Sequence, residues 1–224
     1  MMFGLKRTIW VLLVVLAACA PAPPDGSPSR SVITGSQRTF YNFNASAATW
    51  DIYQHGDSAA FQLNAGTLEG MVIADRGYVW SLDGQAHSDI LVNVTVQQTA
   101  GWVGSAYGVM CRGDEQGNGY YFLISSDQHF SIGVATPVRN ELFYLVPWQF
   151  NSHIKRGFVP NDLRVVCAGD YLALIINDVF VAEAFDREFT TGQLGLTLGA
   201  VRQTARVQFD NLLLRDAFVQ SSRP

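Results

Sequence analysis

The stretch that most constrains the fold is residues 161–199, where short apolar runs alternate with turn residues. In its first run every second residue is apolar, namely Leu163, Val165 and Cys167. This period of two is the pattern of a β-strand with one buried face. The next residues predict a hairpin, with strands at 171–176 and 179–182 joined at Asn177 and Asp178, which tolerate positive φ. The stretch therefore favours antiparallel β-structure.

The chain beyond residue 40 shows similar short apolar runs and no helical run of convincing length. Hydrophobic residues make up 48% of the chain and charged residues 15%, so the apolar surface suffices for one sizeable core. We predict an all-β fold, an antiparallel two-sheet sandwich of about twelve strands. Val207, Phe209 and Leu212 are expected to face its core. The further candidate strands are residues 59–63, 67–73, 78–81, 89–97, 107–112, 120–125, 129–134, 142–146, 193–199 and 206–215.

The N-terminus has the layout of a secretory signal. Lys6 and Arg7 form a basic start, an apolar run covers residues 9–16, and Leu16-Ala17-Ala18-Cys19 ends it. The apolar run is too short to span a membrane as a helix. The last four residues resemble the lipobox of bacterial lipoproteins, which implies cleavage before Cys19 and diacylation of that cysteine. The alternatives are an ordinary signal peptide with a chance cysteine and an uncleaved anchor.

This resemblance implies a place in the bacterial cell envelope, outside the cytoplasm, with the chain anchored to a membrane by lipid. Ala20 follows the cysteine instead of aspartate, which by analogy favours the outer membrane of a two-membrane bacterium. Residues 20–36 hold four prolines among small polar residues and predict an extended tether. The expected division is a signal peptide at 1–18, the lipidated cysteine and tether at 19–37, the sandwich at 38–217 and a C-terminal tail at 218–224.

Several short motifs follow one another along the chain: Tyr78-Val79-Trp80-Ser81, Ser88-Asp89-Ile90, Tyr107-Gly108-Val109-Met110-Cys111-Arg112, Gly119-Tyr120-Tyr121-Phe122, Leu163-Arg164-Val165-Val166-Cys167, residues 186–192 and Val207-Gln208-Phe209-Asp210-Asn211. Their order resembles the concanavalin A-like lectin/glucanase jelly roll. Within that fold the likeness is closest to laminin G-like domains and to the 3-keto-disaccharide hydrolase domain found in bacterial surface lipoproteins. It covers roughly residues 40–215 and implies a carbohydrate-related role.

Two cysteines remain once Cys19 carries lipid, and the leader places them where disulfides persist. Cys111 shares strand parity with Tyr107 and Val109, and Cys167 belongs to the buried face of its own run. We therefore predict a Cys111–Cys167 disulfide. The alternative is two buried free thiols. The sequence disfavours a metal site, because neither cysteine belongs to a CxxC motif.

Catalytic patterns are absent from the sequence. The glucanases of the resembling fold carry Glu-x-Asp-x-Glu on one strand, and this chain has no such motif. The nearest approach, Glu183 with Asp186 and Glu188, has a spacing that sends the first two to opposite faces of a strand. We therefore assign no catalytic residue and lean against an enzyme. No cofactor is expected, except that Asp114, Glu115 and Asn118 are weak calcium-ligand candidates in a loop that also fits a plain polar turn.

Ligand binding demands less of a sequence than catalysis. If Tyr107, Val109 and Cys111 face the core, Arg112 points outward, and Arg164 likewise leaves the outer face of its strand. These two arginines are the first ligand-binding candidates, because arginine is rarely buried without a partner. The further candidates are aromatic stacking surfaces, for which core packing is the alternative. They are Trp80, Tyr121 and Trp148.

The sequence thus predicts a membrane-anchored surface lipoprotein whose jelly roll binds carbohydrate or another surface ligand without catalysis. The alternatives are a glycoside-cleaving enzyme of the same fold and a structural or protein-interaction domain of an envelope assembly. A nucleic-acid partner is not expected, because the formal net charge is −4 and Lys155 is the only lysine beyond the leader. The possible partners are the membrane, through lipid, and a glycan or surface protein.

Overall fold

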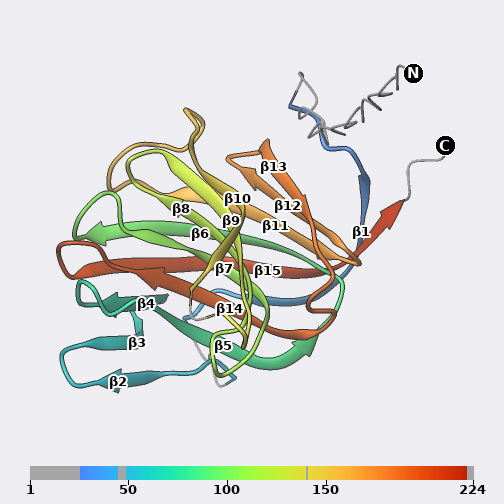
Figure 1. The fold of residues 1–224 in the computed structure, drawn as a ribbon. Helices are drawn as coiled ribbons and strands as arrows, with labels where there is room; N and C mark the ends of the chain where they lie inside the picture. Colours follow the sequence, from blue (N-terminus) through green and yellow to red (C-terminus); the bar gives the residue numbers. More distant parts are fainter. Residues whose placement is uncertain (1–25, 45–48, 140, 221–224) are drawn as a thin grey trace, which may run out of the picture.

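The computed structural model describes residues 26–44, 49–139 and 141–220. Within these ranges, fifteen strands form two antiparallel sheets without any α-helix (Figure 1). Among the described residues no helix is long and apolar enough to cross a membrane. The all-β, two-sheet prediction is confirmed. Cys19, the predicted lipidation residue, lies outside the described ranges.

Every run that the sequence predicts as a strand overlaps a strand of the structure, and two strands, β1 and β2, were not predicted. The strands are β1 (Ser31–Tyr41), β2 (Tyr53–His55), β3 (Ala59–Asn64), β4 (Thr67–Val72), β5 (Tyr78–His87), β6 (Ile90–Ala100), β7 (Ala106–Gly113), β8 (Gly119–Ser125), β9 (His129–Ala135), β10 (Phe143–Phe150), β11 (Asn161–Ala168), β12 (Tyr171–Ile176), β13 (Val179–Phe185), β14 (Gly192–Gly199) and β15 (Ala205–Gln220).

The two sheets differ in size. The nine-stranded sheet has the order β13-β12-β11-β6-β15-β4-β3-β2, and β1 also pairs with β15. The six-stranded sheet has the order β10-β9-β8-β7-β14-β5. The long strands β6 and β15 lie side by side at the centre of the larger sheet (Figure 1). Six of the thirteen strand pairs join strands that are not consecutive in sequence, so long-range pairing holds each sheet together.

The core lies between the sheets and follows the predicted alternation. In β11, Leu163, Val165 and Cys167 are fully buried in it, as predicted. Strand β6 contributes every second residue, from Ile90 to Val96. Each fully buried Val or Leu stabilises the fold by about 1.5–3 kcal/mol relative to an exposed one. The inward parity of the strands therefore supplies most of the apolar stabilisation.

The opposite, outer face of β11 is also covered, which one-sided alternation does not predict. Val166 and Ala168 are buried there and pack with Tyr171 and Ala173 of β12 and with Leu91 of β6. By strand alternation Val166 and Ala168 are expected on the solvent-facing side of β11. Their apolar side chains instead form a second, smaller cluster outside the main core. The larger sheet is therefore buried on both faces over part of its area.

The structure moves both boundaries of the predicted sandwich. Strand β4 pairs with only the first part of β15, at residues 205–209. The remaining edge of β15 would expose unpaired backbone groups, and β1 pairs with it from Ser31 opposite Gln220 to Tyr41 opposite Leu212. Residues 31–37, expected in the tether, are therefore sheet. At the other end β15 runs to Gln220, past the expected start of the tail at 218.

A β-bulge divides β15 into two halves of opposite parity. Asn211 has φ 52°, and the pairing with β6 shifts register between Asp210 and Leu213. Val207 and Phe209 face the core before the bulge, and Leu212 faces it after the bulge. The inward prediction for these three residues is confirmed. Beyond the bulge, the side chains of odd-numbered residues, including Arg215, therefore point to the outer face of the sheet, away from the core.

The predicted disulfide is present. Cys111 in β7 of the smaller sheet is bonded to Cys167 in β11 of the larger sheet, with 6.8 Å between their Cα atoms. The bond therefore joins the two sheets through the core. Because its cysteines are 56 residues apart in sequence, it closes a long loop in the unfolded chain.

Replacing both cysteines, Cys111→Ala with Cys167→Ala, should lower the free energy of unfolding by about 4 kcal/mol, because the unfolded chain regains the entropy of the closed loop. Denaturant titration measures this quantity. A reductant should destabilise the wild type to a similar extent and leave the double variant unchanged. Equal stability of the oxidised wild type and the variant would contradict a structural role for the bond.

Candidate functional site

The sequence-predicted ligand-binding residues do not form one site. Arg112 lies at a corner between the sheets, and Arg164 lines a groove on the outer face of the nine-stranded sheet. Trp80, Tyr121 and Trp148 gather on the outer face of the six-stranded sheet.

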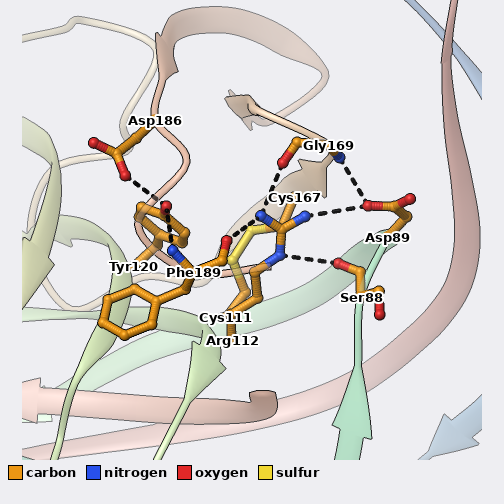
Figure 2. The surroundings of a disulfide bond; sticks show 9 residues. All are labelled: Ser88, Asp89, Cys111, Arg112, Tyr120, Cys167, Gly169, Asp186 and Phe189. Atoms are coloured by element: carbon orange, nitrogen blue, oxygen red, sulfur yellow. Dashed lines mark hydrogen bonds and ion pairs between the residues drawn. A yellow bond between two sulfur atoms is a disulfide. The ribbon is translucent and has the colours of Figure 1, made fainter. Parts of the chain in front are cut away.

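Arg112 is buried, and only 2% of its surface is exposed. Its Nε donates to the Ser88 carbonyl, Nη1 donates to the carbonyls of Gly169 and Phe189, and Nη2 contacts Asp89 (Figure 2). The disulfide lies directly beside the guanidinium in this view. Groups of the protein itself therefore accept the hydrogen bonds of the Arg112 guanidinium. The prediction that Arg112 points outward to a ligand is wrong.

The cause of this difference is local backbone geometry. Arg112 has φ 53°, a left-handed conformation that interrupts the alternation of β7. Met110, two residues earlier, packs on the outer face as alternation requires. After the interruption, the guanidinium turns towards the loops at the ends of β5 and β11. Strict period-two reasoning fails at such a residue.

The surrounding polar contacts hold the same corner together. Asp89 Oδ1 accepts a second hydrogen bond from the Gly169 N–H. Tyr120 donates to Asp186 at 2.6 Å and accepts from the Phe189 N–H (Figure 2). Burial, followed by the hydrogen bond to Asp186, raises the pKa of Tyr120 to about 12. Tyr120 therefore stays a hydrogen-bond donor at neutral pH.

The groove on the outer face of the nine-stranded sheet, here called the outer groove, has a volume of about 770 Å³. Its floor is apolar and includes Leu91, Val166 and Ile175. Three arginines line it: Arg30, Arg164 and Arg215. Arg164 is the one candidate from the sequence that lies here. Sequence reasoning missed Arg215, because only the bulge at Asn211 brings it to this face.

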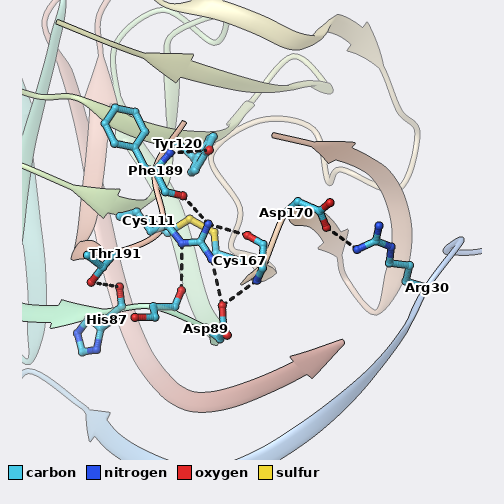
Figure 3. Close-up of polar contacts among 12 residues, drawn as sticks. Arg30, His87, Asp89, Cys111, Tyr120, Cys167, Asp170, Phe189 and Thr191 are labelled. Carbon is cyan, nitrogen blue, oxygen red and sulfur yellow. Dashed lines mark hydrogen bonds and ion pairs between the residues drawn. A yellow bond between two sulfur atoms is a disulfide. The ribbon is translucent and has the colours of Figure 1, made fainter. Parts of the chain in front are cut away.

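The N-terminal segment forms one wall of the outer groove. Arg30 bonds Asp170 at 2.5 Å, and Figure 3 shows this pair. Arg30 also lies over the ring of Phe185, 4.6 Å from its centroid. The Ser29 N–H donates to Glu183. Hydrogen bonds from Arg187 and Arg30 hold the pKa of the Asp170 carboxyl below its usual value. Residues 29 and 30 are therefore attached to the β12–β13 end of the sheet.

A second cavity, here called the edge pocket, has a volume of about 830 Å³ and lies beside β2 and β5, edge strands of the two sheets. The Tyr53 hydroxyl donates to the Trp80 carbonyl at 3.0 Å and so connects the two edges. Burial raises the pKa of Tyr53 to about 12. The lining combines aromatic and charged side chains: Trp50, Tyr53, Tyr78 and Trp80 with Asp51, His55, Arg76 and Glu115.

Trp50 carries an unsatisfied polar atom. It is 4% exposed, and its indole N–H has no hydrogen-bond partner among the described residues. Buried donors are nearly always paired, so such an atom requires an explanation. Sequence reasoning missed Trp50 and Tyr53, although the run Trp50-Asp51-Ile52-Tyr53 concentrates aromatic and acidic residues in a segment without a strand prediction.

The three predicted aromatic candidates have different environments. Trp80 lines the edge pocket. Tyr121 is buried, and its hydroxyl donates to the Gly117 carbonyl. Trp148 is partly buried, and its ring lies 6.3 Å from that of Tyr144. Tyr121 is thus a packing residue, and Trp80 is the candidate that the geometry places in a cavity.

The loop proposed for calcium is a turn whose first carboxylate is engaged internally. Asp114 accepts hydrogen bonds from the backbone N–H groups of Gln116 and Asn118 and from the Asn118 side-chain amide. Within the described residues, no group of three or more His, Cys, Asp or Glu side chains is arranged to hold a metal ion. The calcium hypothesis for Asp114, Glu115 and Asn118 stays a prediction.

Replacing Arg112 with alanine should lower the free energy of unfolding by about 3 kcal/mol or more, because three carbonyls at the corner lose their donor. The matched control is Arg164→Ala, whose ion pair with Asp178 is exposed and should contribute less than about 1 kcal/mol. Denaturant titration of both variants makes the comparison. Equal losses in the two variants would contradict a supporting role for Arg112.

No protein-family model matches the sequence, and a search of curated proteins finds no match. Among solved structures, the chain is similar to a carbohydrate-binding module, CBM66, from Bacillus subtilis, with TM-score 0.61 and 17% identity over 75% of this chain and 96% of that one. It is also similar to the catalytic domain of an endo-1,3-β-glucanase from Thermotoga petrophila, with TM-score 0.57 and 7% identity over 83% and 98%.

A third similar structure is a Bacillus subtilis protein of unknown function with a galectin-like fold, with TM-score 0.56 and 10% identity over 84% of this chain and 99% of that one. At these identities the comparisons establish the architecture and leave the activity to the geometry of the sites. The two antiparallel sheets and these similarities together confirm the predicted resemblance: the chain has the concanavalin A-like jelly-roll fold.

Proposed function

We propose that this chain is a lipid-anchored protein of the bacterial cell envelope whose jelly roll binds carbohydrate in the edge pocket without cleaving it. The observation that carries the proposal is the lining of that pocket, in which aromatic rings and charged groups occur together. Ligand pockets combine apolar surface with a few polar groups in this way. The similarity to a carbohydrate-binding module supports the proposal by analogy of fold.

Each part of the pocket has a role in this proposal. The rings of Tyr78 and Trp80 pack against the C–H face of a sugar ring, which is apolar. The Asp51 carboxylate accepts hydrogen bonds from the hydroxyls of the sugar, and the Arg76 guanidinium donates hydrogen bonds to them.

The mature chain, with Cys19→Ser to remove the lipid, should bind members of a glycan array. On the glycan that binds best, Trp80→Ala should weaken binding by about two- to tenfold, because it removes a partly exposed ring that packs against the sugar. Titration calorimetry measures the change. Trp102→Ala is the matched control, since Trp102 lies outside the pocket and is partly exposed. An array without any binding would contradict the proposal and favour a protein-interaction role.

One observation favours the enzyme alternative: Asp51 and Glu115 both line the edge pocket, and glycoside cleavage uses two carboxylates. Both side chains are exposed, however, whereas a general acid is usually kept protonated by apolar surroundings. Binding therefore agrees better with this geometry than hydrolysis. New reducing ends appearing from a bound glycan, and disappearing in Asp51→Asn and Glu115→Gln, would overturn the non-catalytic part of the proposal.

The proposed anchor is a lipid on Cys19, in a segment outside the described residues. Ser31, the first residue of β1, lies twelve positions after Cys19, so the domain would reach at most about 40 Å from the membrane. In cells fed an alkyne analogue of palmitate, the full chain should incorporate the label, and Cys19→Ser should abolish it. Cys111→Ala is the control and should retain it. Equal labelling of wild type and Cys19→Ser would reject the anchor.

A further inference from the structure

We infer that the outer groove is a second binding site, separate from the edge pocket, that takes an acidic oligosaccharide carrying carboxylate or sulfate groups. Arg30, Arg164 and Arg215 line the groove, and its described lining contains no Asp or Glu. The chain as a whole has the opposite balance, with 19 acidic and 15 basic residues. The charged side chains that line this groove therefore have the opposite sign to the net charge of the chain.

Two of the three arginines have charge to offer a ligand. Arg215 forms no ion pair with any described residue. Arg164 pairs at 3.2 Å with Asp178, whose side chain is 87% exposed, and such a surface pair is weak. Arg30, by contrast, is engaged by Asp170 and builds the wall. Arg164 and Arg215 are thus the ligand-contacting cations, and Arg30 holds the N-terminal segment beside them.

The strand register separates these two cations by a defined interval. Arg164 lies opposite Asn93 of β6, and Arg215 lies opposite Leu91 of the same strand. The two arginines are therefore two strands and two residues apart, which corresponds to about 12 Å between their Cα atoms. This interval exceeds one sugar ring. It suits acid groups on different rings of an oligosaccharide better than a single acidic monosaccharide.

The surface between the arginines is also suited to a sugar chain. Leu91 and Val166 are paired across β6 and β11 and lie on the floor, where they present apolar surface. The Asn93 side chain, bonded at 2.7 Å to Arg164 Nε, fixes the direction of that guanidinium. A planar guanidinium donates two parallel hydrogen bonds to a carboxylate or sulfate, so acid groups are recognised by geometry as well as charge.

A saccharide agrees with these observations better than an anionic membrane surface does. The arginines lie within a groove and are only partly exposed, whereas a membrane-binding surface projects its cations. The ligand must therefore enter the groove to meet the positive charge.

The test uses the mature chain carrying Cys19→Ser and a panel of galacturonic acid tetrasaccharide, a sulfated chondroitin tetrasaccharide and the methyl-esterified galacturonide as the neutral match. We expect at least one acidic probe to bind and the neutral match to bind at least tenfold more weakly. Arg164→Gln and Arg215→Gln should each weaken acidic binding by about 10- to 100-fold, the loss of a hydrogen bond to a charged group. Arg156→Gln is the control, at an exposed arginine outside the groove.

Two further measurements distinguish acidic-saccharide binding in the outer groove from binding in the edge pocket and from binding to an anionic membrane. Trp80→Ala in the edge pocket should leave acidic binding unchanged, so the two sites can fail independently. Vesicles of phosphatidylglycerol should not bind in an arginine-dependent way. Failure of every acidic probe, equal binding of the methyl ester, or wild-type affinity in both groove variants with unchanged melting temperature would overturn the inference. Vesicle binding that is lost in both variants would assign the groove to lipid headgroups instead.

Discussion

The rest of the structure depends on the burial of alternate side chains between the two sheets. Once Leu163, Val165 and Cys167 face inward, the direction of every neighbouring residue in β11 follows, because a strand has a period of two. The same holds across paired strands. Departures from this rule occur at left-handed residues, and two of them matter. Asn211 brings Arg215 to the outer groove, and Arg112 turns its own guanidinium into the corner between the sheets.

That corner links the core to the outer groove through a short series of contacts. The disulfide joins β7 to β11, and Arg112 next to it binds Gly169 and Asp89. Asp170, which follows Gly169 in the chain, forms an ion pair with Arg30 and so holds the N-terminal segment (Figure 3). The wall of the outer groove is therefore connected to the part of the core that the disulfide cross-links. Preorganisation of this kind lowers the entropy that a bound ligand would cost.

The two cavities have different chemistry although one fold carries both. The edge pocket mixes aromatic rings with groups of both signs of charge, whereas the described lining of the outer groove has arginines over an apolar floor. The jelly roll makes such variation easy, because side chains outside the core can change without disturbing inward packing. Fold similarity consequently shows the scaffold, and only the residues in each cavity carry an argument about ligands.

The sequence by itself determined the fold class, the inward parity of β11 and the cysteine pair, because alternation is a local property of the chain. It misplaced residues 31–37, since nothing local shows that half of one edge of β15 needs a partner. It also misdirected Arg112 and missed Arg215, Trp50 and Tyr53. Arg112 and Arg215 depend on a positive φ at a single residue, and Trp50 and Tyr53 lie where the edges of the two sheets meet. Pairing between distant segments decides both features. Tertiary structure alone therefore placed both cavities, because each is assembled from strands far apart in sequence.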